Sequence, residues 1–140
     1  MTKQTPSIEA ESLPVSRLSP YLLSLLRMVA AFTYMAHGMQ KLFGLPAALP
    51  MPHLPPLMLA AGIIETFGGL LLLVGLLTRG VAFVLAGEMA VAYFLMHAPH
   101  GFWPLLNQGE VAVLYCFVFL YLASAGGGAW SLDRLLRRNW

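Results

Sequence analysis

Charged residues are scarce in this chain. They make up 10% of its 140 residues, whereas a typical soluble domain has about 25%. Apolar residues make up 59%, which is too much for an ordinary water-soluble surface. We therefore expect the lipid bilayer to be the solvent for most of the chain. A soluble bundle with fully buried helices is disfavoured, because so short a chain cannot cover them.

Cysteine is nearly absent, and several catalytic motifs are missing. The single cysteine, Cys116, cannot form an internal disulfide or a Cys-x-x-Cys redox pair. We interpret it as a small packing residue. The glycine clusters at 68–69 and 126–128 lack the strand, helix and lysine of a nucleotide-binding loop. No Ser-His-Asp arrangement is evident, so the sequence has no self-contained catalytic motif and leaves open whether the protein is an enzyme.

Long apolar runs dominate what is present. A spanning helix needs roughly 20 mostly apolar residues. Four segments meet this requirement, at about 21–43, 56–77, 80–97 and 109–125. Four prolines between residues 45 and 55 block a helix there, and three glycines at 126–128 end the last span. The sequence therefore predicts an all-α integral membrane protein with four transmembrane helices in an up-down bundle.

The basic residues give the bundle a direction. Most lie near the two ends of the chain or in the turn between the second and third spans, namely Lys3, Arg17, Arg79, Arg134, Arg137 and Arg138. Because cytoplasmic segments carry an excess of Lys and Arg, both ends are predicted to be cytoplasmic. We divide the chain into a polar cytoplasmic segment (1–20), a transmembrane domain (21–125) and a basic cytoplasmic tail (126–140). The same argument disfavours a nucleic-acid partner.

Ionisable residues inside the spans are the functional candidates, because burying them in lipid is costly. On the first helix, Arg27, Tyr34 and Lys41 recur every seven residues, and His37 joins their face. One face of this helix is therefore polar along its length and is expected to point into the bundle.

Depths in the membrane follow from the helical rise. Arg27 and Glu88 lie about 9 Å and about 12 Å from the cytoplasmic edge, so we predict an Arg27–Glu88 ion pair. Glu65 lies about 14 Å from the outer edge. His37, Lys41 and Glu110 lie nearer that edge and, with Tyr34, are the other candidate ligand-binding residues.

Two interpretations of these charges stay open. They either form structural ion pairs that hold the helices together, or they form an outward-facing pocket for a ligand headgroup or a proton path. His97 and His100 follow in the outer loop, and a metal or haem site there is a weak alternative. No His-Glu-x-x-His or Cys-x-x-Cys-His motif supports it, so we predict no metal and no intrinsic cofactor.

Three segments carry a resemblance to a known family. They are RMVAAFTYMAHGMQKLFG at 27–44, IETFGGLLLLVGLLTR at 64–79 and GGGAWSLD at 126–133. Together they resemble the DoxX family of small four-helix bacterial membrane proteins, over about residues 21–136. The last segment departs from the family's usual Gly-Pro-Gly-Arg/Lys-Tyr-Ser-Leu-Asp form.

The resemblance implies an inner-membrane protein with four spans. The family is named for a subunit of a thiosulfate:quinone oxidoreductase, and other members are linked to oxidative-stress or quinone responses. Some associate with soluble redox enzymes. The resemblance carries over no catalytic residues, because the family has no agreed set.

Our leading hypothesis is a membrane subunit of a redox system that binds a quinone-like molecule through His37, Lys41 and Glu65. A partner enzyme would then exchange the electrons. One alternative is a non-enzymatic scaffold that docks a partner redox enzyme through its cytoplasmic arginines and the Ser131–Asp133 segment. Another is a small transporter or proton pathway using Glu65 and Glu88. We expect a narrow interior, which is compatible with a homodimer.

Overall fold

The computed structural model describes residues 14–51 and 53–137, and in this part of the chain all regular structure is helical. Its elements are α1 (Pro14–Phe43), α2 (Pro56–Val74), α3 (Thr78–Ala92), a π-helix (Tyr93–His97), a 3-10 turn (Ala98–His100), α4 (Glu110–Ala125) and α5 (Leu132–Arg137). Lys3 and Arg138, used above to orient the bundle, lie outside the described residues.

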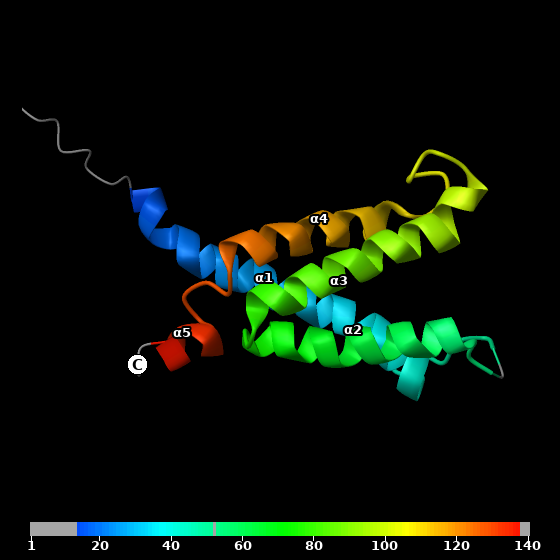
Figure 1. Ribbon diagram of the computed structural model, residues 1–140, viewed down its shortest axis with the longest axis horizontal. Coiled ribbons are helices and arrows are strands. Elements are labelled where there is room, and N and C mark those ends of the chain that lie inside the picture. The colour runs from blue at the N-terminus through cyan, green and yellow to red at the C-terminus, as the bar shows by residue number, and fades with distance from the viewer. Residues whose placement is uncertain (1–13, 52, 138–140) are drawn as a thin grey trace, which may run out of the picture.

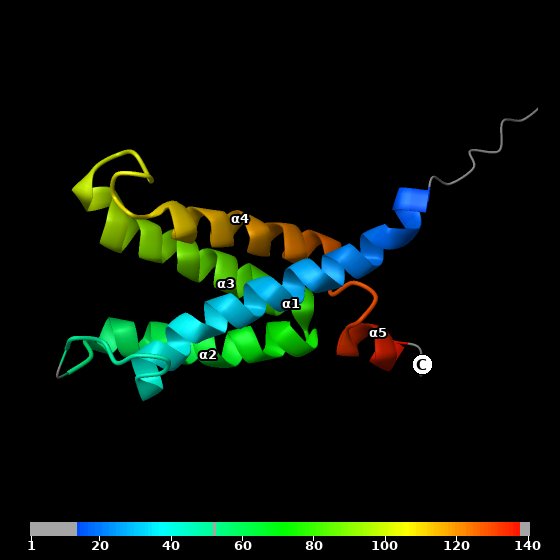
Figure 2. The same ribbon diagram turned by 180° about the vertical axis from the view of Figure 1, so that it is seen from behind.

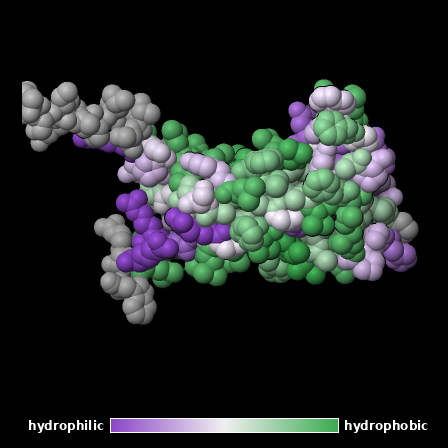
Figure 3. All heavy atoms as spheres, turned by 45° about the horizontal axis from the view of Figure 1, so that its top comes forward, coloured by the Kyte–Doolittle hydropathy of each residue, from purple (hydrophilic) through white to green (hydrophobic). Residues whose placement is uncertain are grey.

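Three helical stretches are long and apolar enough to cross a membrane, namely Arg17–Phe43, Pro56–Val74 and Thr78–His100. The fourth apolar helix, α4, is shorter, at 16 residues. Large apolar side chains point outward from all four, and Phe32, Phe67, Phe83 and Phe117 are each more than half exposed. A surface of this kind suits lipid rather than water, and Figure 3 shows the hydrophilic residues gathered toward the ends of the molecule.

The helices run alternately up and down (Figure 1). Helix α1 packs along α2, and α3 packs along α4. The start of α1, the α2–α3 turn and α5 lie at one end, which we call the closed end, and the two longer loops lie at the other (Figures 1 and 2). The predicted four-helix up-down bundle is confirmed. The assignment of the closed end to the cytoplasm stays a prediction.

The ends of three helices differ from those of the predicted spans. Helix α1 begins at Pro14 and runs through Pro20, where we expected the first span to start at 21. Helix α2 ends at Val74 rather than 77, because Gly75 takes a left-handed conformation (φ 72°) and its N–H caps the helix. Helix α3 then begins at Thr78, two residues earlier than predicted.

Small residues let α1 and α2 approach closely. A Cβ atom added at Gly38 would lie 2.6 Å from the Thr66 nitrogen and 2.8 Å from the Gly62 oxygen. Gly69 is equally restricted, with a Cβ 2.9 Å from that of Met35. In lipid, where helices gain little from the hydrophobic effect, such backbone contact holds a helix pair together.

Arg27 joins three segments at the closed end. Its side chain is fully buried. The guanidinium donates to the carbonyl oxygens of Leu72 and Leu73 at the end of α2, and to those of Gly127 and Trp130 in the segment after α4. The last carbonyls of a helix lack intrahelical partners and carry partial negative charge, so a cation suits this position.

The short helix α5 closes the same end from below. Asp133 accepts hydrogen bonds from the backbone N–H groups of Leu77 and Thr78, each at 2.8 Å, and thereby caps the start of α3. Burial raises the pKa of Asp133, but the hydrogen bonds from Thr78 and Leu77 and the nearby charge of Arg137 together lower it by more, so the pKa lies below its usual value. Ser131 is buried. Two residues of the expected docking segment, Ser131 and Asp133, thus make contacts within the molecule, while Leu132 is exposed, and the docking of a partner there stays a prediction.

Candidate functional site

A large cavity lies between the two helix pairs. Helices α2 and α3 meet at the tight turn and diverge away from it (Figure 1), which leaves a cavity of about 1,130 Å³ lined by all four long helices and by the loop before α4. The interior is thus wider than the sequence led us to expect.

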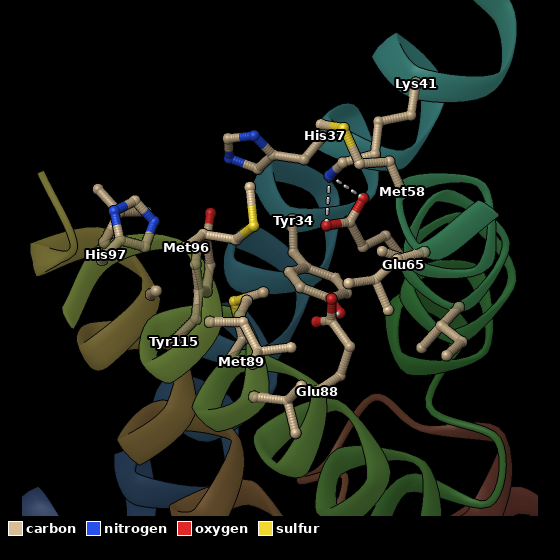
Figure 4. Close-up of a pocket in the computed structure, with 18 of the residues that line it drawn as sticks. Tyr34, His37, Lys41, Met58, Glu65, Glu88, Met89, Met96, His97 and Tyr115 are labelled. Atoms are coloured by element: carbon tan, nitrogen blue, oxygen red, sulfur yellow. Dashed lines mark hydrogen bonds and ion pairs between the residues drawn. The ribbon is translucent and has the colours of Figure 1, made fainter. Parts of the chain in front are cut away.

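The polar stripe of α1 borders this cavity. Tyr34, His37 and Lys41 all line it, whereas Arg27 lies at the closed end. Figure 4 shows Lys41 beside Glu65 of α2 and Tyr34 beside Glu88 of α3, while the His37 ring points toward the side of Met96 and His97. The helical spacing that predicted a shared face therefore places these groups together. The stripe has two parts, one bonded to backbone at the closed end and one lining the cavity.

Lys41 and Glu65 form an ion pair across the α1–α2 contact. The Lys41 Nζ atom lies 2.6 Å from both carboxylate oxygens of Glu65. The side chains of Lys41 and Glu65 are 17% and 4% exposed. Because each charge is met by the other, the pair can sit in an apolar environment that neither would tolerate alone.

Glu88 bonds Tyr34 and not Arg27. The Tyr34 hydroxyl donates to Glu88 Oε2 at 2.7 Å, while the Arg27 guanidinium is bound to carbonyls at the closed end. The predicted Arg27–Glu88 ion pair is therefore wrong. The depth estimate failed because α1 starts well before the α2–α3 turn, which places Arg27 level with that turn and Glu88 about 15 Å further along α3.

Aromatic rings fix Tyr34 from the α4 side. Its ring meets Phe119 edge-on at 4.9 Å and Tyr115 at 5.6 Å between centroids. The centroid of the Tyr115 ring also lies 6.3 Å from that of the His37 ring. The Tyr115 hydroxyl donates a hydrogen bond to the Thr33 hydroxyl. The Tyr34 hydroxyl is thereby directed toward Glu88.

The two outer-loop histidines also line the cavity, but backbone contacts hold them. His97 Nδ1 lies 3.0 Å from the Asn107 oxygen, and His100 Nδ1 lies 3.0 Å from the Met96 oxygen. Within residues 14–51 and 53–137, no three His, Cys, Asp or Glu side chains are grouped to hold a metal ion.

Glu110 is the candidate that the structure does not bring to the cavity. It is exposed at the first turn of α4 and is absent from the cavity wall. The depth estimate placed Glu110 near the outer edge of the membrane. Such an estimate does not say which side of α4 faces the cavity. Rotation of this helix turns Ala112 and Tyr115 toward the cavity instead.

Sequence reasoning missed part of the cavity wall. Tyr115 was not a candidate, although Ala112, Tyr115 and Phe119 share one helical face and could have indicated the inward side of α4. Three methionines were also missed. Met58 lies on α2, while Met89 and Met96 lie on α3 and the π-helix that continues it, and all three line the cavity. The spacing of seven residues between Met89 and Met96 could have indicated a shared face, but nothing in the sequence connects Met58 to them.

Comparison with known proteins gives several related chains. An uncharacterised protein of Haemophilus influenzae is 42% identical over 125 residues, which covers 85% of this chain and 93% of that protein. Inner membrane protein YqjF of Escherichia coli is 38% identical over 80 residues, covering 56% of this chain and 60% of its own length. The uncharacterised membrane protein Rv3486 of Mycobacterium tuberculosis is 26% identical over 137 residues, covering 81% and 80%. No solved structure matches the chain.

The family model for DoxX matches residues 22–98, more than half of the chain. The matched segment contains Tyr34, His37, Lys41, Glu65 and Glu88, and thus both polar pairs of the cavity. Helix α4, with Tyr115, lies beyond it. This is a membrane protein, and it belongs to the DoxX family.

Proposed function

We propose that the chain is an inner-membrane protein of a redox or oxidative-stress system, and that its large cavity binds a quinone-like molecule. The observation that carries the proposal is the wall of this cavity, which combines an apolar lining with a few convergent polar groups. Such a combination is typical of small-molecule sites. The relative YqjF of Escherichia coli is named an inner membrane protein, which supports the location.

The apolar lining suits a flat ring with an aliphatic tail. Leu57, Ala61, Val91, Leu95 and Leu106 contribute from α2, from α3 and the π-helix that continues it, and from the outer loop. The three methionines add flexible, polarisable side chains that adapt to irregular ligands. Drug-sized ligands occupy cavities of about 300–1,000 Å³, so a volume of about 1,130 Å³ leaves room for a ring and part of a tail.

The polar groups suit the ring oxygens of such a ligand. A lysine ammonium has three donors, and Glu65 takes up two of them, which leaves one for a ligand carbonyl. The His37 side chain is exposed at the cavity and offers a second donor (Figure 4). The Tyr34–Glu88 pair lies on the other side of the same opening and provides a third polar contact.

Electron transfer to or from the bound molecule requires a second redox centre. We assign that centre to a partner enzyme, because the chain has a single cysteine and its described residues hold no group of three metal-ligating side chains. In this proposal the chain holds the quinone-like molecule in the membrane, and the partner exchanges electrons with it.

A binding experiment tests the proposal. The purified chain in nanodiscs would be titrated with short-chain ubiquinone and menaquinone analogues, as wild type and as His37→Ala and Glu65→Gln variants. Loss of one hydrogen bond involving a charged group is worth about 1.5–3 kcal/mol, so affinity should fall at least tenfold. Glu110→Gln is the matched control, because this exposed carboxylate lies at the same end but outside the cavity. Unchanged affinity in both test variants would remove the idea.

Glu88 favours a second candidate function, a proton or solute pathway. Its carboxylate accepts a hydrogen bond from Tyr34, and the one ion pair among the described residues is Lys41–Glu65. A half-buried carboxylate inside a membrane span is a typical relay group of proton pathways. Proton flux into liposomes that is lost in Glu88→Gln and kept in Glu110→Gln would favour this candidate over the quinone site.

A further inference from the structure

A second, smaller cavity lies near the closed end of the bundle, between α2, α3 and α5. Its volume is about 600 Å³. Most of its wall is apolar, with Leu71 from α2 and Val81 and Leu85 from α3. Arg79, Arg137, Asp133 and Thr78 supply the polar part. We call this space the arginine groove, and the function proposed above does not use it.

We propose that the arginine groove binds one anionic phospholipid. The lipid phosphate contacts Arg79 and Arg137, and an acyl chain lies along the apolar wall. Basic pockets between transmembrane helices favour anionic headgroups in this way. The position fits as well, since Figure 3 shows hydrophilic residues gathered at this end and apolar side chains over the body of the bundle.

The charge balance of the groove favours an anion. Its charged groups are the two arginines and Asp133. The Asp133 carboxylate already accepts the N–H groups of Leu77 and Thr78. Both arginines are exposed residues. The charge of Arg137 acts on Asp133, but neither arginine belongs to the one ion pair found among the described residues, so the groove keeps one positive charge in excess. Both arginines line the groove, and the Arg79 guanidinium lies close to Gly126 at the end of α4. An arginine matches a phosphate because its guanidinium presents a planar fork of donors.

The fold brings both arginines to the groove. Arg79 is the second residue of α3 and is placed by the tight turn after α2. Arg137 follows Asp133 by four residues, which is about one helical turn, so the cap that anchors α5 on α3 also holds Arg137 at the groove. Arg134 lies on the same short helix but outside the groove.

Lipid retention by the purified full-length chain tests this site. The protein in detergent would be incubated with phosphatidylglycerol and phosphatidylcholine of the same acyl chains, and bound lipid counted by native mass spectrometry. We expect preferential retention of phosphatidylglycerol. One arginine near a membrane surface is worth roughly fivefold in affinity for anionic lipid, so Arg79→Gln and Arg137→Gln should each weaken retention by about that factor. Arg134→Gln is the control that should leave retention unchanged.

A steric variant tests the groove independently of charge. Gly80 lines the groove, and a Cβ added there meets no atom within 4 Å. Gly80→Phe should therefore fold and yet exclude the acyl chain, with both arginines intact. Equal retention of the two lipids by wild type would overturn the proposal. So would an Arg134→Gln loss as large as that of Arg137→Gln, or displacement of the lipid by equimolar glycerol phosphate, which would indicate a site for free anions.

Discussion

Replacement of Arg27 tests how the closed end is held together. The side chain is fully buried and spans from α1 to the end of α2 and to the segment after α4. Arg27→Gln keeps a polar group of moderate size but removes the charge and the planar fork. Arg27→Lys keeps the charge and removes only the fork. Comparing the two separates the contribution of charge from that of geometry.

The expected loss can be worked from the bonds. Two of the acceptors, the carbonyls of Leu72 and Gly127, lie in fully buried surroundings. An unpaired buried carbonyl costs about 1–3 kcal/mol, so Arg27→Gln should lower the free energy of unfolding by about 2–6 kcal/mol. The part-buried carbonyls of Leu73 and Trp130 add less, since water or lipid headgroups can reach them. Arg27→Lys should fall between Arg27→Gln and wild type.

Unfolding in mixed micelles with rising sodium dodecyl sulfate, followed by circular dichroism, gives these free energies. The decisive measurement is a double-mutant cycle with Glu88→Gln. Arg27 and Glu88 share no hydrogen-bond partner, so their effects should add to within about 0.5 kcal/mol. A coupling energy well above that value would restore the ion pair predicted from the sequence and refute the geometry described here.

Two further substitutions test the helix contact and the cap. Gly38→Ala brings a Cβ against the Thr66 backbone nitrogen and should cost about 1–3 kcal/mol in the same unfolding assay. Gly87→Ala is the control and should not lower the stability of the protein, because open space surrounds that position. Equal effects of the two substitutions would contradict the close contact of α1 and α2. Because the pKa of Asp133 is lowered in the fold, the stability it adds is present above the ordinary aspartate pKa of about 3.9 and is lost as the pH falls through the lowered value. Asp133→Ala should cost about 0.5–2 kcal/mol at pH 7 and remove that part of the acid sensitivity, and an unchanged acid profile would count against the cap.

The four-helix architecture was predictable because composition and helix length decide it. Apolar runs of spanning length separated by proline-rich and glycine-rich breaks leave few other arrangements in lipid. Helix ends were less predictable. We expected the first span to start at residue 21, just after Pro20, yet α1 begins at Pro14 and passes through Pro20. Pro20 has no N–H and therefore cannot donate the usual hydrogen bond within the helix. Its carbonyl, however, accepts hydrogen bonds from Ser24 and Ala129, which hold this part of α1 in place.

The candidate site was predictable along α1 and less so across the bundle. Spacing of three, four and seven residues is fixed by helix geometry, so Tyr34, His37 and Lys41 had to share a face. The height of one helix relative to another is set by tertiary contacts, here by Arg27 on the end of α2. Because α1 is displaced along its axis relative to α3, Glu88 lies beside Tyr34 rather than beside Arg27. The rotation of α4, which excludes Glu110 from the cavity, is likewise a matter of packing.

The same contacts link the closed end to the cavity. Arg27 and Asp133 fasten α1, α2, α3 and α5 where α2 and α3 meet. Further along the bundle, the Tyr34–Glu88 and Tyr115–Thr33 hydrogen bonds join the two helix pairs, and beyond these two bonds no side-chain hydrogen bond between the pairs is found among the described residues. The helices are therefore held together at one end and free to diverge at the other, and the cavity occupies the divergence. Loosening the closed end should consequently alter ligand binding at His37 even though Arg27 touches no part of the cavity wall. Weakened quinone-analogue binding by a folded Arg27→Lys variant would demonstrate this link, and unaltered binding would show that the cavity keeps its shape without it.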